Sequence, residues 1–177
     1  MRLPVFIFFT LLLASCSPSL KYYTSELDRK AGWSESELRK IQFYISDDIV
    51  LWRDISKGET EVIKGKIKMV DGRRVEEVVI KRGTPGTYLF TTGKEHYAIG
   101  FDSTDDNKYL IFGPSDQVNG RYVLLAREWG ARRGKVTYGE KIYETAANSA
   151  YSYLLVDVDR KAKTKVSSES PGGRKVK

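Results

Sequence analysis

Residues 61–81 read EVIKGKIKMVDGRRVEEVVIK, and this stretch decides the fold class. Ile63, Ile67 and Met69 alternate with lysines along its first half. Because successive side chains of a β-strand point to opposite faces, this period of two predicts a strand with one buried face and one wet face.

The middle of the same stretch predicts a tight turn. Asp71-Gly72 is the residue pair favoured in a type I′ turn, where both positions have positive φ. Residues 73–81 then return as a second strand. A two-residue turn at this point sets Lys66 opposite Glu77, which is a favourable cross-strand pair.

Further short strands extend this pattern in both directions along the chain. Thr84-Pro85-Gly86 has the residues of a tight turn, and Gly, Asn, Asp or Pro also separate the segments that follow. The predicted strands are residues 43–54, 87–92, 96–101, 109–112, 121–127, 135–138, 141–145 and 151–157. Short strands with such regular turns are typical of a mainly β fold, a single antiparallel sandwich or small barrel.

One short helix is expected before the strands. Ser34 and Glu37 have the spacing of a capping box, in which each side chain bonds the backbone N–H of the other position. We expect a helix over residues 35–42. The fold is then predicted to span residues 34–158 as one domain.

The N-terminus has the order of a secretory signal. Arg2 is followed by an apolar run, LPVFIFFTLLL, over residues 3–13. As a helix this run rises about 16 Å, roughly half of a bilayer's hydrocarbon core, so it is too short for an ordinary transmembrane span.

The next four residues, Leu13-Ala14-Ser15-Cys16, resemble the lipobox of bacterial lipoproteins. That resemblance covers the first sixteen residues. It implies cleavage between Ser15 and Cys16, a diacylglycerol on the Cys16 thiol, and an acylated new amino terminus. Residues 1–15 are then a signal peptide, residues 16–33 a lipidated tether and lead-in, and the membrane is a partner of the chain. The alternative is an ordinary secretory signal in which the cysteine is incidental.

Two further phrases, QFYISDDIVL at residues 42–51 and GKVTYG at residues 134–139, are similar to uncharacterised lipoproteins of Bacteroidetes bacteria. No activity is implied by that resemblance. In lipoproteins that use the usual sorting route, an aspartate after the cysteine retains the protein at the inner membrane. The residue here is Ser17, so the resemblance implies the outer membrane, and the absence of an acidic cluster after it implies the periplasmic face.

The net charge of +7 is unevenly distributed. Residues 159–177 hold seven basic and two acidic residues, whereas residues 16–158 hold 22 basic and 21 acidic residues. A nearly neutral body gives no electrostatic reason to expect nucleic acid as a partner. The tail, rich in Ser, Gly and Lys, is predicted to be disordered, either as a solubilising end or as a contact for anionic lipid.

Few residues suggest catalysis. His96 is the only histidine, so any Ser-His-acid triad must use it, and no site with several histidine ligands can form. The neighbouring carboxylates Asp47/Asp48, Glu76/Glu77 and Asp105/Asp106 are the other candidates. The first two pairs are predicted on strands, where neighbours point to opposite faces and cannot work as a pair on one surface unless a bulge intervenes. We therefore assign no catalytic residue.

No cofactor or metal is expected. The loop at residues 102–107, DSTDDN, has enough oxygens for Ca²⁺ but lacks the ligand spacing and glycine of the known calcium loop, so an acidic hairpin is the preferred interpretation.

Aromatic residues are plentiful. On strands they usually fill a core, but a row of exposed rings including Tyr97, Tyr109 and Tyr122 is the alternative, as a contact for a glycan or a protein. The sequence thus predicts a membrane-anchored envelope lipoprotein that is a non-catalytic binding or assembly module of unknown partner. A small envelope hydrolase that uses His96 or a carboxylate pair is the alternative.

Overall fold

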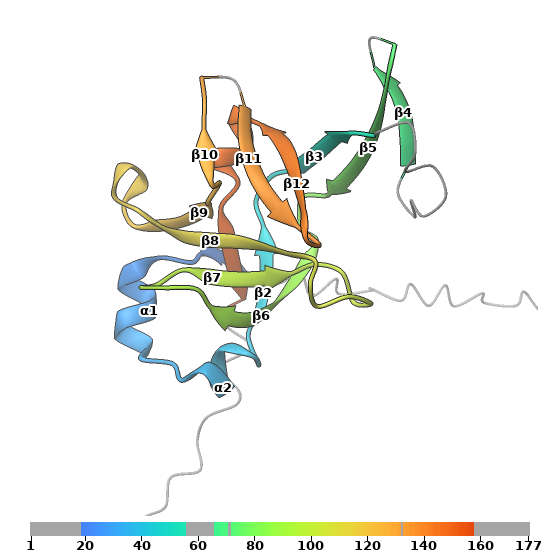
Figure 1. The fold of residues 1–177 in the computed structure, drawn as a ribbon. Coiled ribbons are helices and arrows are strands. Elements are labelled where there is room, and N and C mark those ends of the chain that lie inside the picture. The colour runs from blue at the N-terminus through green and yellow to red at the C-terminus, as the bar shows by residue number, and fades with distance from the viewer. Residues whose placement is uncertain (1–18, 56–65, 71, 132, 158–177) are drawn as a thin grey trace, which may run out of the picture.

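The computed structural model describes residues 19–55, 66–70, 72–131 and 133–157. They form two antiparallel β-sheets with few helices, which is a sandwich and not a closed barrel (Figure 1). The predicted fold class is therefore confirmed. Cys16, Ser15 and the basic tail lie outside the described residues.

The first sheet has seven strands. In spatial order they are β1 (Leu20–Tyr22), β13 (Leu154–Asp157), β2 (Gln42–Ile45), β6 (Pro85–Thr91), β7 (Tyr97–Gly100), β8 (Tyr109–Ser115) and β9 (Arg121–Leu124). The second sheet has six strands, in the order β10 (Glu128–Trp129), β11 (Arg133–Tyr138), β12 (Lys141–Ala146), β3 (Ile49–Asp54), β5 (Arg73–Ile80) and β4 (Lys66–Val70). The helices are α1 (Ser25–Ala31), α2 (Glu35–Leu38), and the 3₁₀ turns η1 (Asp116–Val118) and η2 (Ala147–Tyr151).

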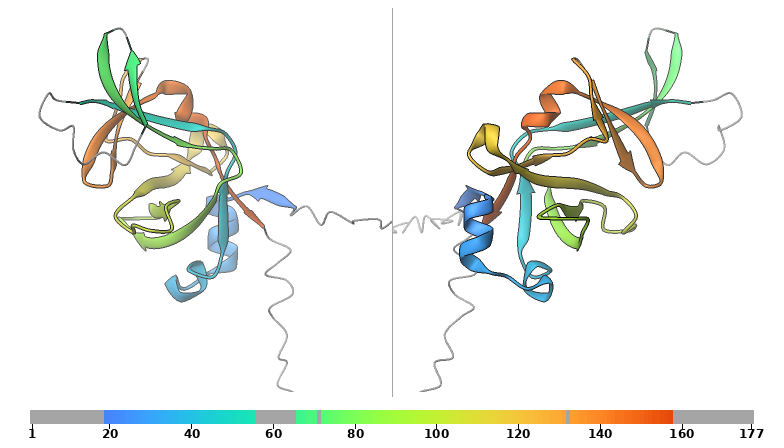
Figure 2. Two further views of the ribbon diagram at one scale, coloured as in Figure 1. Left: turned by 90° about the vertical axis from the view of Figure 1, so that its right-hand side faces the viewer. Right: turned by 60° about the vertical axis from the view of Figure 1, so that its left-hand side comes forward.

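The β4–β5 hairpin forms as the sequence predicts. Lys66 lies opposite Glu77 and Val70 lies opposite Arg73, which leaves two residues for the turn. Gly72 has the positive φ, 75°, that such a turn needs. Asp71 and residues 61–65 of the predicted strand lie outside the described residues. The hairpin projects away from the body, on the far side from α1 and α2 (Figures 1 and 2).

The predicted strand over residues 43–54 is wrong in one respect, because it is two strands in different sheets. β2 ends at Ile45 and β3 begins at Ile49, and both isoleucines are fully buried. Between them, Asp48 accepts hydrogen bonds from the backbone N of Arg82 (2.7 Å) and from Nζ of Lys81 (2.9 Å). The apolar alternation continues through this corner because both sheets face the same core.

The lead-in predicted over residues 16–33 belongs to the fold from Leu20 onward. It contains β1 and α1. Thr24 caps α1 by accepting a hydrogen bond from the backbone N of Leu27 (3.1 Å), and Gly32 ends the helix with a φ of 57°. No residue of α1 is fully buried, so it lacks the apolar stripe by which a helix is usually predicted.

The helix predicted over residues 35–42 is shorter in the structure. The backbone N of Ser34 donates to Oε2 of Glu37 (3.0 Å), as expected for a capping box. The helix α2 spans four residues, however, and Gln42 already begins β2. Two short N-terminal helices therefore replace the predicted one.

The core lies between the sheets. One of its fully buried large side chains, Tyr23, lies between β1 and α1. The others share an inward position on their strands, and they are Tyr88, Tyr122, Phe43, Phe112, Ile45, Ile49, Leu51, Ile99, Leu110, Leu124 and Leu154. Gly86 of β6 makes room for this core, because a Cβ atom at that position would lie 2.6 Å from Cε1 of Phe101.

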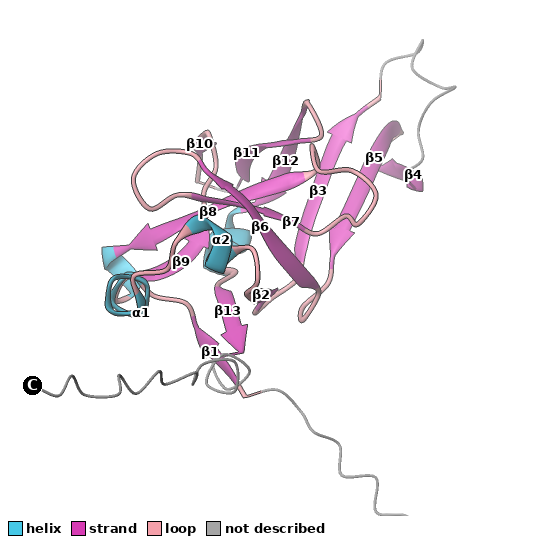
Figure 3. Cartoon of the chain, turned by 90° about the horizontal axis from the view of Figure 1, so that it is seen from below, coloured by secondary structure: helices cyan, strands magenta, loops and turns pink. Residues whose placement is uncertain are grey.

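The first and last described strands are neighbours. β1 pairs with β13, and Leu20 lies opposite Asp157 (Figure 3). The chain therefore enters and leaves the described body at the same edge. No helix within the described residues is long and apolar enough to cross a membrane.

Candidate functional site

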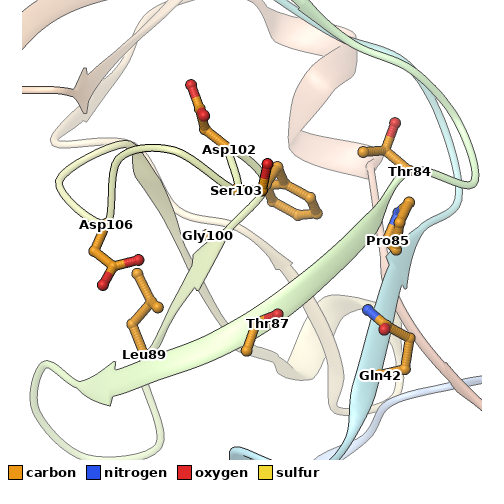
Figure 4. Close-up of a pocket in the computed structure, with 10 residues that line it drawn as sticks. Gln42, Thr84, Pro85, Thr87, Leu89, Gly100, Asp102, Ser103 and Asp106 are labelled. Atoms are coloured by element: carbon orange, nitrogen blue, oxygen red, sulfur yellow. The ribbon is translucent and has the colours of Figure 1, made fainter.

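An open cleft of about 520 Å³ lies on the outer side of β6 and β7, beneath the loop that follows β7 (Figure 4). Its floor comes from the outward-facing positions of these strands, and its rim comes from β2 and the loop. The lining residues are Gln42, Thr84, Pro85, Thr87, Leu89, Gly100, Phe101, Asp102, Ser103 and Asp106.

The acidic rim of the cleft is held by contacts within its own loop. Asp102 accepts hydrogen bonds from the Thr104 hydroxyl (2.6 Å), the Thr104 backbone N (2.9 Å) and Nζ of Lys108 (2.9 Å). These bonds stabilise the carboxylate, the Thr104 hydroxyl most, and they lower the pKa of Asp102 to about 2. Nζ of Lys108 also lies 3.9 Å from Asp105, so an ammonium group already occupies the space between these two carboxylates.

The loop accordingly has the geometry of an acidic hairpin closed by Lys108. Among the described residues no group of three or more His, Cys, Asp or Glu side chains could hold a metal ion. On the opposite rim, Nε2 of Gln42 donates to the carbonyl O of Gly86 (2.9 Å), which fixes the amide. The ten lining residues include no histidine, lysine or cysteine, and their polar side chains are two carboxylates, one amide and the hydroxyls of serine and threonine.

His96 lies apart from the cleft, at the start of β7. Its ring covers Gly113 of β8, where an added Cβ atom would lie 2.7 Å from Cδ2 of the imidazole. Within the described part of the chain, no side-chain hydrogen bond or ion pair joins His96 to a serine or a carboxylate. The structure does not assemble a triad around it there.

The carboxylate pair Glu76/Glu77 is divided between two faces, as expected. Glu76 is buried and accepts a hydrogen bond from Nε of Arg53 (2.7 Å), with Nζ of Lys141 at 3.7 Å. Glu77, the next residue on β5, points to the other face and lies opposite Trp52 of β3.

The other two pairs lie in turns and not on strands. Asp47 accepts a hydrogen bond from the Ser46 hydroxyl (2.7 Å), and Asp48 fixes the corner described above. Asp105 accepts from the backbone N of Asn107 (3.0 Å), while Asp106 points toward Leu89 at the cleft (Figure 4). These contacts explain the carboxylates as parts of turns.

The alternative of an exposed row of Tyr97, Tyr109 and Tyr122 does not hold for two of its three members, which lie in the core as the preferred interpretation expects. Tyr97 and Tyr122 are buried, whereas Tyr109 is half-buried beside Phe90, with ring centroids 5.0 Å apart. Tyr97 and Tyr122 belong instead to a cluster around Asp28 of α1, a residue that no motif in the sequence singles out.

We call Asp28 with Tyr23, Tyr97 and Tyr122 the tyrosine cluster. The three hydroxyls donate to the Asp28 carboxylate at 2.5, 2.7 and 3.2 Å, respectively. The rings of Tyr23 and Tyr122 also pack edge to face at 4.8 Å. A carboxylate that is partly buried needs hydrogen-bond donors in place of water, so these three hydrogen bonds hold α1 against the sheet.

The tyrosine cluster also joins the two edges of the seven-stranded sheet. The backbone N of Tyr23 donates to the carbonyl O of Leu154 on β13 (2.8 Å), and its own carbonyl O accepts from the backbone N of Tyr122 on β9 (3.0 Å). Tyr23 therefore links β13, β9 and α1 at one point.

Comparison of the chain with models of known protein families, with curated proteins and with solved structures finds no match. The site must therefore be interpreted from its own geometry.

The structure predicts that Asp28→Ala lowers the free energy of unfolding by about 2–4 kcal/mol, because three tyrosine hydroxyls lose a charged acceptor inside the protein. Glu26→Ala is the matched control, since Glu26 lies on the same helix, is exposed, and bonds only Lys30. Urea unfolding measures both variants. Equal stability of the two variants would contradict the structural role of Asp28.

The tyrosine cluster also predicts a loss of stability in alkali. Burial, followed by the hydrogen bond to Asp28, raises the pKa of Tyr23 and of Tyr97 above the ordinary value of 10.0, and burial with the Asp28 charge raises the pKa of Tyr122. A pKa raised by folding stabilises the protein fully below pH 10.0, and this contribution is lost as the pH rises toward the folded pKa.

Phenolate absorbance titrated against pH, with far-ultraviolet circular dichroism alongside, measures this effect. Tyr97→Phe should remove part of the phenol ionisation that accompanies unfolding, because the Tyr97 hydroxyl is protected by the fold. Tyr151→Phe is the matched control, since Tyr151 is 63 % exposed and lies outside the cluster, and it should leave the pH midpoint of unfolding unchanged. If Tyr97→Phe removes none of the ionisation that accompanies unfolding, the cluster does not exclude phenolate.

Proposed function

We propose that this chain is a lipid-anchored protein of the bacterial cell envelope and that it works as a non-catalytic binding or assembly module. The lipobox-like Leu13-Ala14-Ser15-Cys16 is the basis for the anchor, with the thiol of Cys16 as the lipid acceptor. Two or three acyl chains hold a protein to a bilayer almost permanently.

The observation that carries this proposal is the pairing of Leu20 with Asp157. Only Ser17, Pro18 and Ser19 separate Cys16 from β1. Four steps of extended chain span at most about 14 Å, so a lipid on Cys16 keeps the β1–β13 edge beside the bilayer. The basic tail starts after Asp157 at the same edge, where a contact of its lysines and arginines with anionic lipid costs the least chain entropy.

The side of the molecule opposite the β1–β13 edge suits a protein that presents a surface to a binding partner. With the β1–β13 edge at the membrane, the β4–β5 hairpin extends away from it (Figures 1 and 2). Met69 on this hairpin is 66 % exposed. A rigid sandwich with a projecting hairpin suits a protein that meets a partner above the bilayer.

The hydrolase alternative receives no support from the positions of its candidate residues. His96 covers Gly113, Glu76 pairs with Arg53, and Asp48 holds a corner of the fold. Each group thus has a structural explanation. We therefore favour binding over catalysis.

We place the protein on the inner leaflet of the outer membrane, facing the periplasm. Ser17 after the lipidated cysteine, and the absence of acidic residues over residues 17–23, are the reasons. Cleavage of the protein by protease added to intact cells would contradict this orientation.

Cys16→Ser should abolish incorporation of labelled fatty acid and leave uncut precursor, because the thiol is the atom that accepts lipid. Ser17→Ala is the matched control, which changes the adjacent side chain and keeps the thiol. Fatty-acid labelling, gel mobility and membrane fractionation measure the outcome. Labelled fatty acid or normal cleavage in the Cys16→Ser protein would show that the anchor is assigned wrongly.

A further inference from the structure

Four neighbouring strands of the seven-stranded sheet present one continuous row of side chains outward. Tyr22 of β1 lies opposite Leu155 of β13, Leu155 lies opposite Tyr44 of β2, and Tyr44 lies opposite Pro85 of β6. Directly opposed residues in antiparallel strands share a face, so these four side chains lie on the same side. We call them the outer row.

The inner neighbours confirm which face this is. Val156 and Phe43, each next in sequence to a member of the outer row, are opposed to one another and are buried in the core. The outer row itself is exposed or half-buried, and Tyr22 is 42 % exposed. Three of its four members are therefore large apolar or aromatic groups left at the surface.

Arg121 and Tyr153 extend the outer row at the β1 end. The guanidinium carbon of Arg121 lies 4.0 Å from the ring centroid of Tyr22 and 5.3 Å from that of Tyr153. The rings of Tyr22 and Tyr153 meet edge to face at 5.3 Å. Tyrosine with arginine gives an amphipathic surface, since apolar rings and stems lie beside a hydroxyl and a cation.

The outer face of the other sheet is different in kind. There the register aligns Glu128, Lys135, Glu144, Trp52 and Glu77 across five strands. Lys135 pairs with Glu128 at 3.0 Å, and Glu144 accepts bonds from Arg133 and from Nε1 of Trp52. The aligned row on this face is mostly charged, which suits water.

We propose that the outer row, with Arg121 and Tyr153, docks on the headgroup region of the lipid bilayer. This inference rests on the proposed anchor at Cys16. Tyr22 is only six residues from that cysteine, so about 20 Å of extended chain is the longest possible separation. Aromatic rings with a polar group favour the interface between lipid and water, and Arg121 complements lipid phosphate.

Docking of the outer row on the bilayer is compatible with the proposed projection of the β4–β5 hairpin away from the membrane. β1 is an edge strand, and the outer row begins on it. Contact through this face turns the charged face of the six-stranded sheet toward water. The lipid, the aromatic surface and the start of the basic tail then lie on the same side of the molecule.

Cys16 is the only cysteine, which allows a test that does not depend on processing in cells. The chain from Cys16 to Lys177 contains every described element and couples through its thiol to a maleimide lipid in vesicles of phosphatidylcholine and phosphatidylglycerol. Tyr44→Trp reports on the outer row, and Ile142→Trp, at a 53 % exposed position of β12, reports on the opposite sheet. Emission of the unsubstituted protein, which has Trp33, Trp52 and Trp129, is subtracted.

Brominated lipid should quench the added tryptophan in Tyr44→Trp and shift its emission to shorter wavelength, while Ile142→Trp should show no quenching. Leu155→Glu introduced into the Tyr44→Trp chain should reduce that quenching, with circular dichroism confirming that the fold persists. Equal response of the two reporters, or no effect of Leu155→Glu, would overturn the inference.

Two alternatives to lipid as the group that covers the outer row give distinct results. If the chain's own tail covers the outer row, ending the chain at Asp159 will shift Tyr44→Trp emission without vesicles and overturn the inference. If a protein partner covers it, vesicles will leave this emission unchanged. Failure of fatty-acid labelling in cells, by contrast, would overturn the anchor and leave the vesicle result to decide the surface.

Discussion

The hydrogen bonds from Tyr23, Tyr97 and Tyr122 to Asp28 are the constraint on which the arrangement of this molecule depends. A half-buried carboxylate beside buried rings is stabilised by these donors, so the bonds favour the observed position of α1 on the sheet. The backbone of Tyr23 is bonded at that point to both β13 and β9. β1 is consequently held against β13, and the two ends of the described body lie together.

This arrangement gives the two sheets different surroundings. The seven-stranded sheet carries the ends of the body and an outward row of tyrosine, leucine and proline, whereas the six-stranded sheet carries paired charges and the projecting hairpin. A short tether limits how far the first face can move from an anchored lipid. The difference between the two faces and the position of the chain ends therefore both favour the proposed orientation, with the seven-stranded sheet toward the membrane.

The sequence predicts a mainly β fold, a sandwich or small barrel, and the β4–β5 hairpin, because alternation and turn residues are local signals. It fails at residues 43–54, where one apolar pattern serves two sheets, and at α1, which buries no residue fully and is marked only by Thr24 and Gly32. The tyrosine cluster is beyond sequence reasoning for another reason. Asp28 meets partners 69 and 94 residues away, and only the folded topology brings them together.

In the orientation that we propose, the β1–β13 edge faces the membrane and the β4–β5 hairpin faces away from it. Paramagnetic relaxation of backbone amides by a lipid with a spin-labelled headgroup distinguishes this orientation from others, with the chain from Cys16 onward coupled to lipid in nanodiscs. We expect the strongest relaxation at Leu20–Tyr22 and Gln42–Ile45 and the weakest at Lys66–Val70. Relaxation that is uniform over the body, or strongest at the hairpin, would contradict it.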